Sequence, residues 1–131
     1  MYLLDSNICI YIINRRPKQV VERIKQEKPA DVQLSAISLG ELEYGVSKSP
    51  FRDKNRIALV DFVSAFEILE YNDEDAEVFG VIRADLENRG LVIGPYDMQI
   101  ASQALVRNLV LVTNNTKEFE RIPGLKLENW V

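Results

Sequence analysis

The chain has 131 residues, which at about 100 to 200 residues per domain predicts a single domain over residues 1–131. It has no histidine and a single cysteine, Cys9, which excludes imidazole catalysis, histidine-ligated zinc, internal disulfides and cysteine metal cages. Its longest uninterrupted apolar run, Ile8–Ile13, is too short to span a membrane, and the N-terminus lacks the pattern of a signal peptide. We therefore expect a cytoplasmic protein in which carboxylates carry any chemistry.

The net charge of −4 is unevenly distributed along the chain. Residues 1–60 hold ten basic and seven acidic side chains, or +3, whereas residues 61–131 hold six and thirteen, or −7, and the two sum to −4. Arg15, Arg16 and Lys18 belong to one basic cluster and Lys48, Arg52, Lys54 and Arg56 to a second, and these clusters are a candidate phosphate-binding surface. Solvated helix faces are the commoner explanation for any one such residue.

The apolar pattern predicts alternating strands and helices. Tyr2–Leu4 is predicted as a strand that ends at Asp5, and Ser6 as the N-cap of a helix over Asn7–Asn14. The other predicted elements are, in order, a helix between Pro17 and Pro29, a strand over Val32–Ile37, a helix capped by Ser38 and closed by Pro50, a helix over 53–65, a strand over Glu67–Leu69, a helix over Asp73–Asn88 capped by Asp73, a helix from Gly94-Pro95, a strand over Leu109–Val112, a helical turn over Lys117–Phe119 and a strand near Lys126–Leu127. This alternation predicts an α/β fold, a three-layer α/β/α sandwich with a mainly parallel central sheet.

Polar side chains that follow strands are candidates for a site, because ligands of open α/β sheets bind beyond the carboxyl ends of the strands. Asp5 follows the first strand, and Asn115 follows the strand over Leu109–Val112. A short polar residue such as Asp5 is also explained as one that shapes the turn into the next helix.

Asp97 is a sharper candidate than Asp5. It lies three and four residues before the apolar Ile100 and Ala101, so its carboxylate is predicted to point toward the protein interior. Favourable interaction with the helix dipole contributes only about 0.3 to 1 kcal/mol, and burial of an unpaired carboxylate costs more. Because this helix has no cation before Arg107, we expect an ion pair from elsewhere or a metal ion.

Three glutamates are less clearly assigned by the residues alone. Glu41 and Glu43 share the helix that precedes Pro50; at 100° per residue, Glu43 lies near its apolar stripe and Glu41 away from it. Either one, like Glu118 on the turn after Asn115, is also explained as a surface glutamate.

A group of carboxylates without histidine suits Mg²⁺ or Mn²⁺, which is usually held by few carboxylates plus waters and keeps positions for phosphate. Such an ion lowers the pKa of a water and neutralises charge on the phosphate. The residues therefore predict metal-dependent phosphodiester hydrolysis.

Four fragments also resemble a known family. They are Leu4–Ile10, Ile37–Gly45, Ile93–Asp97 and Leu111–Phe119. Their order and spacing, in a chain of this length, resemble those of the PIN-domain ribonucleases, specifically the VapC-like toxins of bacterial toxin–antitoxin pairs. The resemblance spans nearly the whole chain and implies a PIN-like fold.

The resemblance implies roles for particular residues. Asp5, Glu41 and Asp97 become the acidic catalytic residues that bind the metal and converge in one pocket, and Glu41 is preferred over Glu43. Asn115 is also expected to be catalytic. It stands where the family often has a fourth acid and brings no charge, and Glu118 is expected to replace that missing acid in part. Positioning or substrate-contacting roles are implied for Asn7, Ser38, Thr113 and Glu118. Of these, Ser38 is expected to hold the helix start, and Asn7 to contact Asp5 or the substrate.

The resemblance further implies a homodimer that cleaves RNA, with tRNA and the initiator tRNA anticodon loop as the expected target. It also implies a VapB antitoxin whose C-terminal segment lies in a groove and blocks the site. A catalytically inactive PIN-like module that binds RNA or a partner stays open as an alternative, because Asn115 departs from the family pattern. Haloacid-dehalogenase-like phosphatases and response-regulator receivers require further acids where this chain has Ser6 and Asn7.

Overall fold

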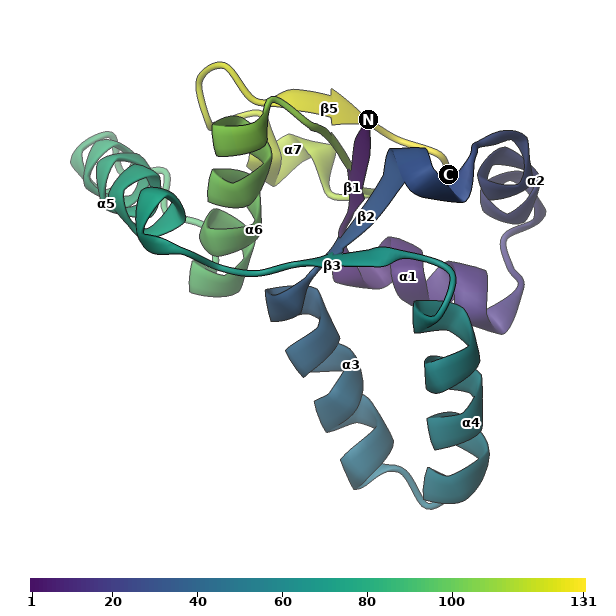
Figure 1. The fold of residues 1–131 in the computed structure, drawn as a ribbon. Helices are drawn as coiled ribbons and strands as arrows, with labels where there is room; N and C mark the ends of the chain where they lie inside the picture. The colour runs from purple at the N-terminus through teal and green to yellow at the C-terminus, as the bar shows by residue number, and fades with distance from the viewer.

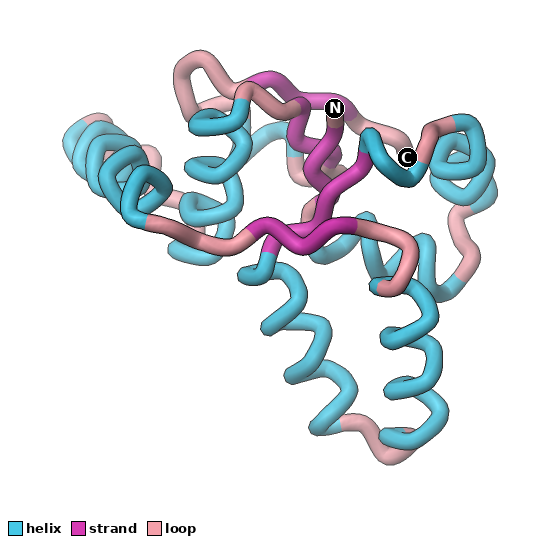
Figure 2. Tube along the Cα trace, in the orientation of Figure 1, coloured by secondary structure: helices cyan, strands magenta, loops and turns pink.

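The computed structural model describes residues 1–131 as a central sheet with helices on both faces (Figures 1 and 2). The strands are β1 (Tyr2–Leu4), β2 (Val32–Ser35), β3 (Glu67–Leu69), β4 (Val110–Val112) and β5 (Lys126–Glu128). The helices are α1 (Ser6–Asn14), α2 (Lys18–Gln26), α3 (Ala36–Lys48), α4 (Arg52–Val63), α5 (Asp73–Asn88), α6 (Pro95–Arg107) and α7 (Thr116–Phe119), with a 3-10 turn over Pro29–Asp31. None of the helices has both the length and the apolar character needed to cross a membrane.

All five strands are parallel, in the order β3-β2-β1-β4-β5. The central strand β1 pairs with β2 on one side and β4 on the other, so that Leu4 lies beside both Leu34 and Val112. The predicted three-layer fold is confirmed. Because the chain extends the sheet first toward β3 and later toward β5, the topology switches direction at β1 and β4, which is where ligands of such sheets bind.

Two apolar cores lie on opposite faces of the sheet. Leu3 and Leu111 are fully buried in the core formed with α5, α6 and α7. The next residues along the same strands, Leu4 and Val112, are fully buried in the core formed with α1 to α4. Successive strand side chains point to opposite faces, so burial on both faces explains why these strands are continuously apolar.

Helices α1 and α3 begin earlier than predicted because each follows its strand with little or no loop. Asp5, not Ser6, is the N-cap of α1, and its side chain accepts a hydrogen bond from the backbone N–H of Ile8. Likewise Ser35, the last residue of β2, is the N-cap of α3. The prediction that Ser38 caps this helix was wrong, since Ser38 lies inside its first turn.

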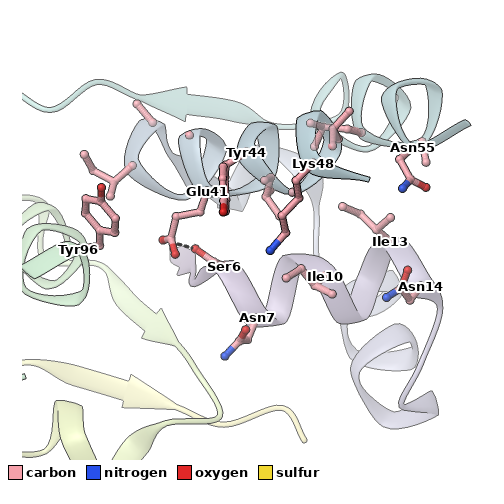
Figure 3. Close-up of a pocket in the computed structure, with 18 residues that line it drawn as sticks. Ser6, Asn7, Ile10, Ile13, Asn14, Glu41, Tyr44, Lys48, Asn55 and Tyr96 are labelled. Atoms are coloured by element: carbon pink, nitrogen blue, oxygen red, sulfur yellow. Dashed lines mark hydrogen bonds between the residues drawn. The ribbon is translucent and has the colours of Figure 1, made fainter. Parts of the chain in front are cut away.

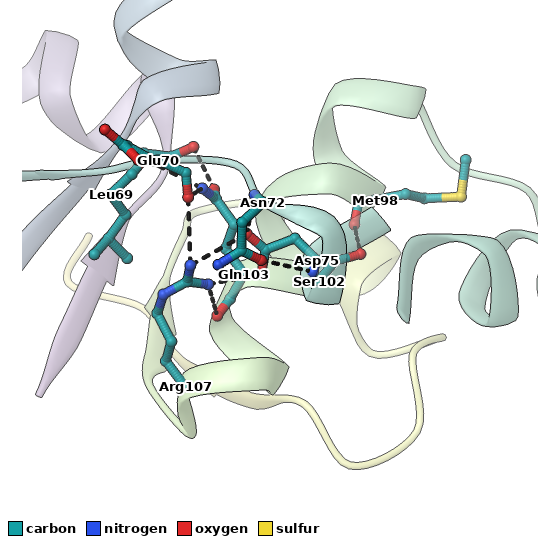
Figure 4. Close-up of polar contacts among 9 residues, drawn as sticks. Leu69, Glu70, Asn72, Asp75, Met98, Ser102, Gln103 and Arg107 are labelled. Carbon is teal, nitrogen blue, oxygen red and sulfur yellow. Dashed lines mark hydrogen bonds and ion pairs between the residues drawn. The ribbon is translucent and has the colours of Figure 1, made fainter. Parts of the chain in front are cut away.

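The N-cap of α5 also differs from the prediction by one residue. Asn72, not Asp73, is the N-cap, and it forms a reciprocal capping box with Asp75. Asp75 is fully buried, and its two oxygens accept hydrogen bonds from Arg107 of α6 at 2.7 and 3.2 Å. This ion pair, drawn in Figure 4, ties the start of α5 to the end of α6.

A second buried polar contact joins α6 to the sheet. Gln103 is fully buried; its amide donates to the backbone oxygens of Leu69 and Glu70, and its Oε1 accepts a hydrogen bond from Ser35 at 2.5 Å (Figure 4 draws Gln103 and its contacts with β3). The hydroxyl of Ser35 also accepts a hydrogen bond from the backbone N–H of Ile37. Gln103 therefore links α6, which carries Asp97, to the beginning of α3, which carries Glu41. The sequence pattern did not predict this contact. The feature that could have indicated it is Gln103, a polar residue on the apolar face of the helix.

Candidate active site

Asp5 lies at the carboxyl end of β1, and only 6% of its surface is exposed. One carboxylate oxygen accepts the N–H of Ile8 at 3.0 Å, and the other accepts the hydroxyl of Thr113 at 2.5 Å. Burial raises the pKa of Asp5, the hydrogen bonds from Thr113 and Ile8 oppose that shift, and the charge of Glu41 adds to it. Asp5 thus both starts α1 and brings a buried carboxylate to this edge of the sheet.

Glu41 extends from α3 to the beginning of α1. The Ser6 hydroxyl donates a hydrogen bond to its Oε1 at 2.7 Å (Figure 3). Glu43 instead pairs with Arg56 of α4. The two glutamates separate because α3 packs between α1 and α4, so that the side of the helix bearing Glu43 meets α4 while Glu41 meets α1.

Asp97 lies in the first turn of α6, after the N-cap Gly94 and Pro95. Its half-buried side chain makes no hydrogen bond or ion pair, and a Cβ at Gly94 would lie 3.7 Å from its Oδ2. Burial is the first cause that raises the pKa of Asp97 to about 6. The other causes are the negative charges of Asp5, Glu41 and Glu118.

The end of β4 supplies the remaining polar groups. Thr113 is fully buried; besides donating to Asp5, its hydroxyl accepts the backbone N–H of Asn115 at 2.9 Å. The side-chain amide of Asn115 donates to Oε2 of Glu118 at 3.0 Å. Thr113 thus connects Asp5 to the loop after β4, and Asn115 orients the Glu118 carboxylate whose charge acts on Asp97.

Four acids therefore gather where the sheet topology switches direction, and no lysine or arginine forms an ion pair with Asp5, Glu41, Asp97 or Glu118. Charges held together without a cation destabilise the ionised forms, as the raised pKa of Asp97 shows. The donor set consists of carboxylate and hydroxyl oxygens, which is the chemistry that Mg²⁺ and Mn²⁺ prefer.

The acidic side chains lie farther apart than the direct ligands of one enclosed metal ion would. No three acidic side chains are grouped tightly enough in this conformation to enclose a metal ion directly. Asp5 accepts a hydrogen bond from the hydroxyl of Thr113, and Glu41 accepts one from the hydroxyl of Ser6. Because Mg²⁺ usually keeps several waters and binds through one or two carboxylates, this arrangement still fits a hydrated divalent ion.

Two other predicted site residues, Ser38 and Asn7, make no side-chain hydrogen bond to the acids. Ser38 is fully buried one turn before Glu41, and its hydroxyl has no hydrogen-bond partner in the protein. The side chain of Asn7 is exposed and makes no hydrogen bond to Asp5, but the backbone N–H of Asn7 interacts with the Asp5 carboxyl and opposes the rise of its pKa. Asn7 instead lines the groove described below, and its contact with substrate stays a prediction.

The three basic residues lie away from the acids. Arg15 ends α1 with a φ of 57°, Arg16 precedes Pro17, and Lys18 lies 3.6 Å from a carboxylate oxygen of Glu22. They follow the nine residues of α1, which at 1.5 Å per residue place them about 13 Å from its start. The structure does not bring them to the acids, and their contact with RNA stays a prediction.

A groove of about 1030 Å³ lies between α1, α3 and α4, and Glu41 is the one acid of the site that lines it. Glu41 and Ser6 lie in it, with Tyr96 to one side of Glu41 and Lys48 to the other (Figure 3). Its wall is largely apolar. The sequence offers no reason to assign a role to Tyr44 or Tyr96, whereas Lys48 belongs to the second basic cluster that was a candidate phosphate-binding surface. These side chains stand out only by their exposure in the fold, and a single sequence does not show which side chains are exposed.

Comparison with known proteins places this arrangement in a family. The PIN domain family matches residues 2–125. The chain is 44% identical to ribonuclease VapC2 of Rickettsia felis over 131 residues, covering 99% of the chain and 98% of that protein. The chain belongs to the PIN-domain family of VapC ribonucleases. The resemblance inferred from the four sequence fragments is thereby confirmed.

Further relatives of this VapC family agree. The chain is 42% identical to a protein of Salmonella typhimurium named tRNA(fMet)-specific endonuclease VapC, covering 98% of the chain and 97% of that protein. The crystal structure of VapBC2 from Rickettsia felis bound to a DNA fragment from its promoter matches with a TM-score of 0.93, covering 99% of this chain and 98% of that chain at 44% identity. PIN-domain ribonucleases generally depend on a divalent metal ion.

Proposed function

We propose that this chain is a metal-dependent endoribonuclease toxin that cleaves tRNA and is neutralised by a VapB-like antitoxin. The observation that carries the proposal is the set of four acids, without a cationic partner, at the switch point of the sheet. A relative 42% identical is named as an endonuclease specific for tRNA(fMet), which supports the initiator tRNA as substrate. The similar VapBC2 complex supports the antitoxin.

In the proposed site, Asp5, Glu41 and Asp97 would hold Mg²⁺ or Mn²⁺. When bound, such an ion neutralises charge on the phosphate and lowers the pKa of the attacking water. Thr113 and the N–H of Ile8 fix both oxygens of Asp5, and Ser6 fixes one oxygen of Glu41. Asp97 forms no hydrogen bond within the protein, so both of its oxygens are free to bind the ion or to orient water.

The remaining polar groups act around this centre. Asn115 holds the carboxylate of Glu118 toward the site and thereby compensates for the charge that Asn115 itself does not bring. Hydrolysis adds water across one phosphodiester bond and leaves a 5′-phosphate and a 3′-hydroxyl. The homodimer, and a single PIN domain over residues 1–131, stay predictions of the family resemblance.

The test is cleavage of initiator tRNA by purified, antitoxin-free protein with Mg²⁺, Mn²⁺ or a chelator. Asp5→Asn and Asp97→Asn are compared with Glu43→Gln, a matched control because Glu43 pairs with Arg56 outside the site. We expect metal-dependent cleavage by the unsubstituted chain and by Glu43→Gln, and none by the other two. Cleavage in chelator would contradict the proposal, and RNA binding without cleavage would support the inactive binding module.

A further inference from the structure

Two exposed tyrosines flank the candidate active site. Tyr44 on α3 is 65% exposed and Tyr96 on α6 is 61% exposed, although both line the same groove as Glu41. Tyr44 lies three residues after Glu41 along α3, and Tyr96 directly precedes Asp97. Figure 3 shows Tyr96 to one side of Glu41, and Tyr44 with Lys48 to the other. A strand that lies in the groove across Glu41 can therefore contact both aromatic rings.

Lys48 is the only cation that lines this groove. Its ammonium lies 4.8 Å from the centre of the Tyr44 ring and pairs with no carboxylate, unlike Arg56, which pairs with Glu43. Lys48 follows Glu41 by seven residues on α3, a distance of about 10 Å along the helix axis. Stacked single strands rise about 3.4 Å per nucleotide, so this distance spans about three nucleotides.

We propose that Tyr44, Lys48 and Tyr96 form a nucleotide-binding subsite for single-stranded RNA, in which bases on either side of the scissile phosphate stack on the two tyrosines. Lys48 binds a phosphate about three nucleotides away. The inference rests on the proposed nuclease function, because it assumes that the scissile phosphate lies at Glu41 and its neighbours.

The charges and shapes favour RNA over a peptide. The acids repel a polyanion, so an RNA strand at this edge needs binding energy from groups outside the acid cluster. Exposed aromatic faces supply it without reading sequence, because every base has a face that can stack. Lys48 adds a contact to a phosphate, because its distance from Glu41 matches the rise of about three nucleotides in a single strand. The apolar floor of the groove also suits an amphipathic peptide, and the experiment includes that outcome.

The experiment measures binding of a labelled oligoribonucleotide, with the sequence of a tRNA anticodon loop, by fluorescence anisotropy in chelator, so that no cleavage occurs. Tyr44→Ala and Tyr96→Ala are each expected to weaken binding about 5- to 150-fold, the range measured for loss of one stacked base. Tyr44→Phe retains the aromatic face and is expected to bind like the unsubstituted chain. Phe51→Ala is the matched control, because Phe51 is 67% exposed and lies outside the groove.

The salt dependence of binding tests Lys48 separately. Lys48→Gln is expected to reduce the slope of log affinity against log salt by about 0.7, the value of one phosphate contact to a single strand. Lys54→Gln, an exposed lysine on α4 outside the groove, is expected to leave the slope unchanged.

The outcomes separate this inference from the proposed nuclease function. If the chain cleaves tRNA but the Tyr44, Tyr96 and Lys48 variants bind and cleave normally, the subsite is refuted and the function stands. If the variants lose RNA binding but the chain cleaves nothing with any divalent ion, the nuclease function is refuted, and Tyr44, Lys48 and Tyr96 are an RNA-binding site without a scissile phosphate. If the variants weaken binding of the cognate antitoxin alone, the groove is a protein-binding surface and the inference is wrong.

Discussion

Two buried aspartates of this protein have opposite surroundings. Asp75 is fully buried, and its carboxylate is neutralised by Arg107 and accepts the N–H of Asn72. Asp5 is nearly as buried, but its carboxylate interacts with a hydroxyl and backbone N–H groups and faces further acids instead of a cation. The first arrangement holds two helices together, whereas the second raises the pKa of its own carboxylate.

The difference distinguishes an acid that stabilises the fold from one that serves a site. A buried charge is costly unless it is paired, and the fold pairs Asp75 from within the chain. The same fold leaves Asp5, Glu41, Asp97 and Glu118 without a cationic partner at one edge of the sheet, where a bound cation would supply the missing charge in the proposed site. Uncompensated, perturbed carboxylates in a groove are typical of functional sites.

We expect the largest effect when the ion pair between Asp75 and Arg107 is broken. Arg107→Met leaves Asp75 buried without its cation and is expected to lower the free energy of unfolding by about 3 to 5 kcal/mol. Urea denaturation monitored by circular dichroism measures this change. The double variant Arg107→Met with Asp75→Asn removes the charge as well and is expected to recover part of the loss. Equal stability of Arg107→Met and the unsubstituted chain would show that Asp75 needs no cation.

A substitution in the other region is expected to act on activity instead of stability. Asp97→Asn removes a charge from the acid cluster, and we expect tRNA cleavage to fall at least about 100-fold, or about 2.7 kcal/mol of the activation barrier. Single-turnover cleavage of initiator tRNA with Mn²⁺ measures the effect, with Glu43→Gln as control. Retention of more than a tenth of the rate would remove Asp97 from the proposed site.

The same residue predicts a pH dependence of stability. The folded protein raises the pKa of Asp97 from 3.8 to about 6, so it binds the proton more tightly than the unfolded chain does. The contribution of Asp97 to the free energy of unfolding is therefore fully present below pH 4 and is lost as pH rises to about 6. The full shift corresponds to about 3 kcal/mol, and partial solvent contact reduces it to about 1 to 2 kcal/mol.

The comparison that isolates this contribution is the difference between the unsubstituted chain and Asp97→Asn, in chelator, from pH 4 to pH 7. Asp97→Asn is expected to become the more stable of the two as pH rises, although it is the less active enzyme. Parallel stability curves over this range would contradict the account of the charge cluster.

The smallest expected effect concerns the orientation of Glu41. Ser6→Ala removes the hydrogen bond that fixes one oxygen of this partly exposed glutamate, which is worth about 0.5 to 1.5 kcal/mol. We expect a few-fold loss of cleavage rate and a change in stability below 1 kcal/mol. Ser6→Thr keeps the hydroxyl and serves as the control. A loss as large as that of Asp97→Asn would give Ser6 a direct role.

The sequence predicted the layers of this fold well, because strands buried on both faces and helices with one apolar stripe leave clear patterns. It placed three N-caps wrongly, by one residue for Ser6 and Asp73 and by three for Ser38. A strand that passes directly into a helix makes its own last residue or the next one the cap, and a sequence pattern does not show where the strand pairing stops.

The site was predicted in part from residues and in part from family resemblance. The position of Asp5 after a strand and of Asp97 before an apolar stripe carried a physical signal. The choice of Glu41 over Glu43 did not, because it depends on which neighbouring helix packs on each side of α3. The buried contact of Gln103 and the exposure of Tyr44 depend on residues distant in sequence, so a single chain without its fold does not reveal them.

We expect the unpaired acids at the switch point of the sheet to bind one divalent cation. Calorimetric titration of Mn²⁺ into the antitoxin-free protein measures this binding, with Asp97→Asn and Glu43→Gln titrated alongside. The account predicts a single binding event of equal affinity for the unsubstituted chain and Glu43→Gln, and at least about tenfold weaker binding for Asp97→Asn, or about 1.4 kcal/mol. Equal Mn²⁺ affinity in all three proteins, or no binding in any of them, would contradict it.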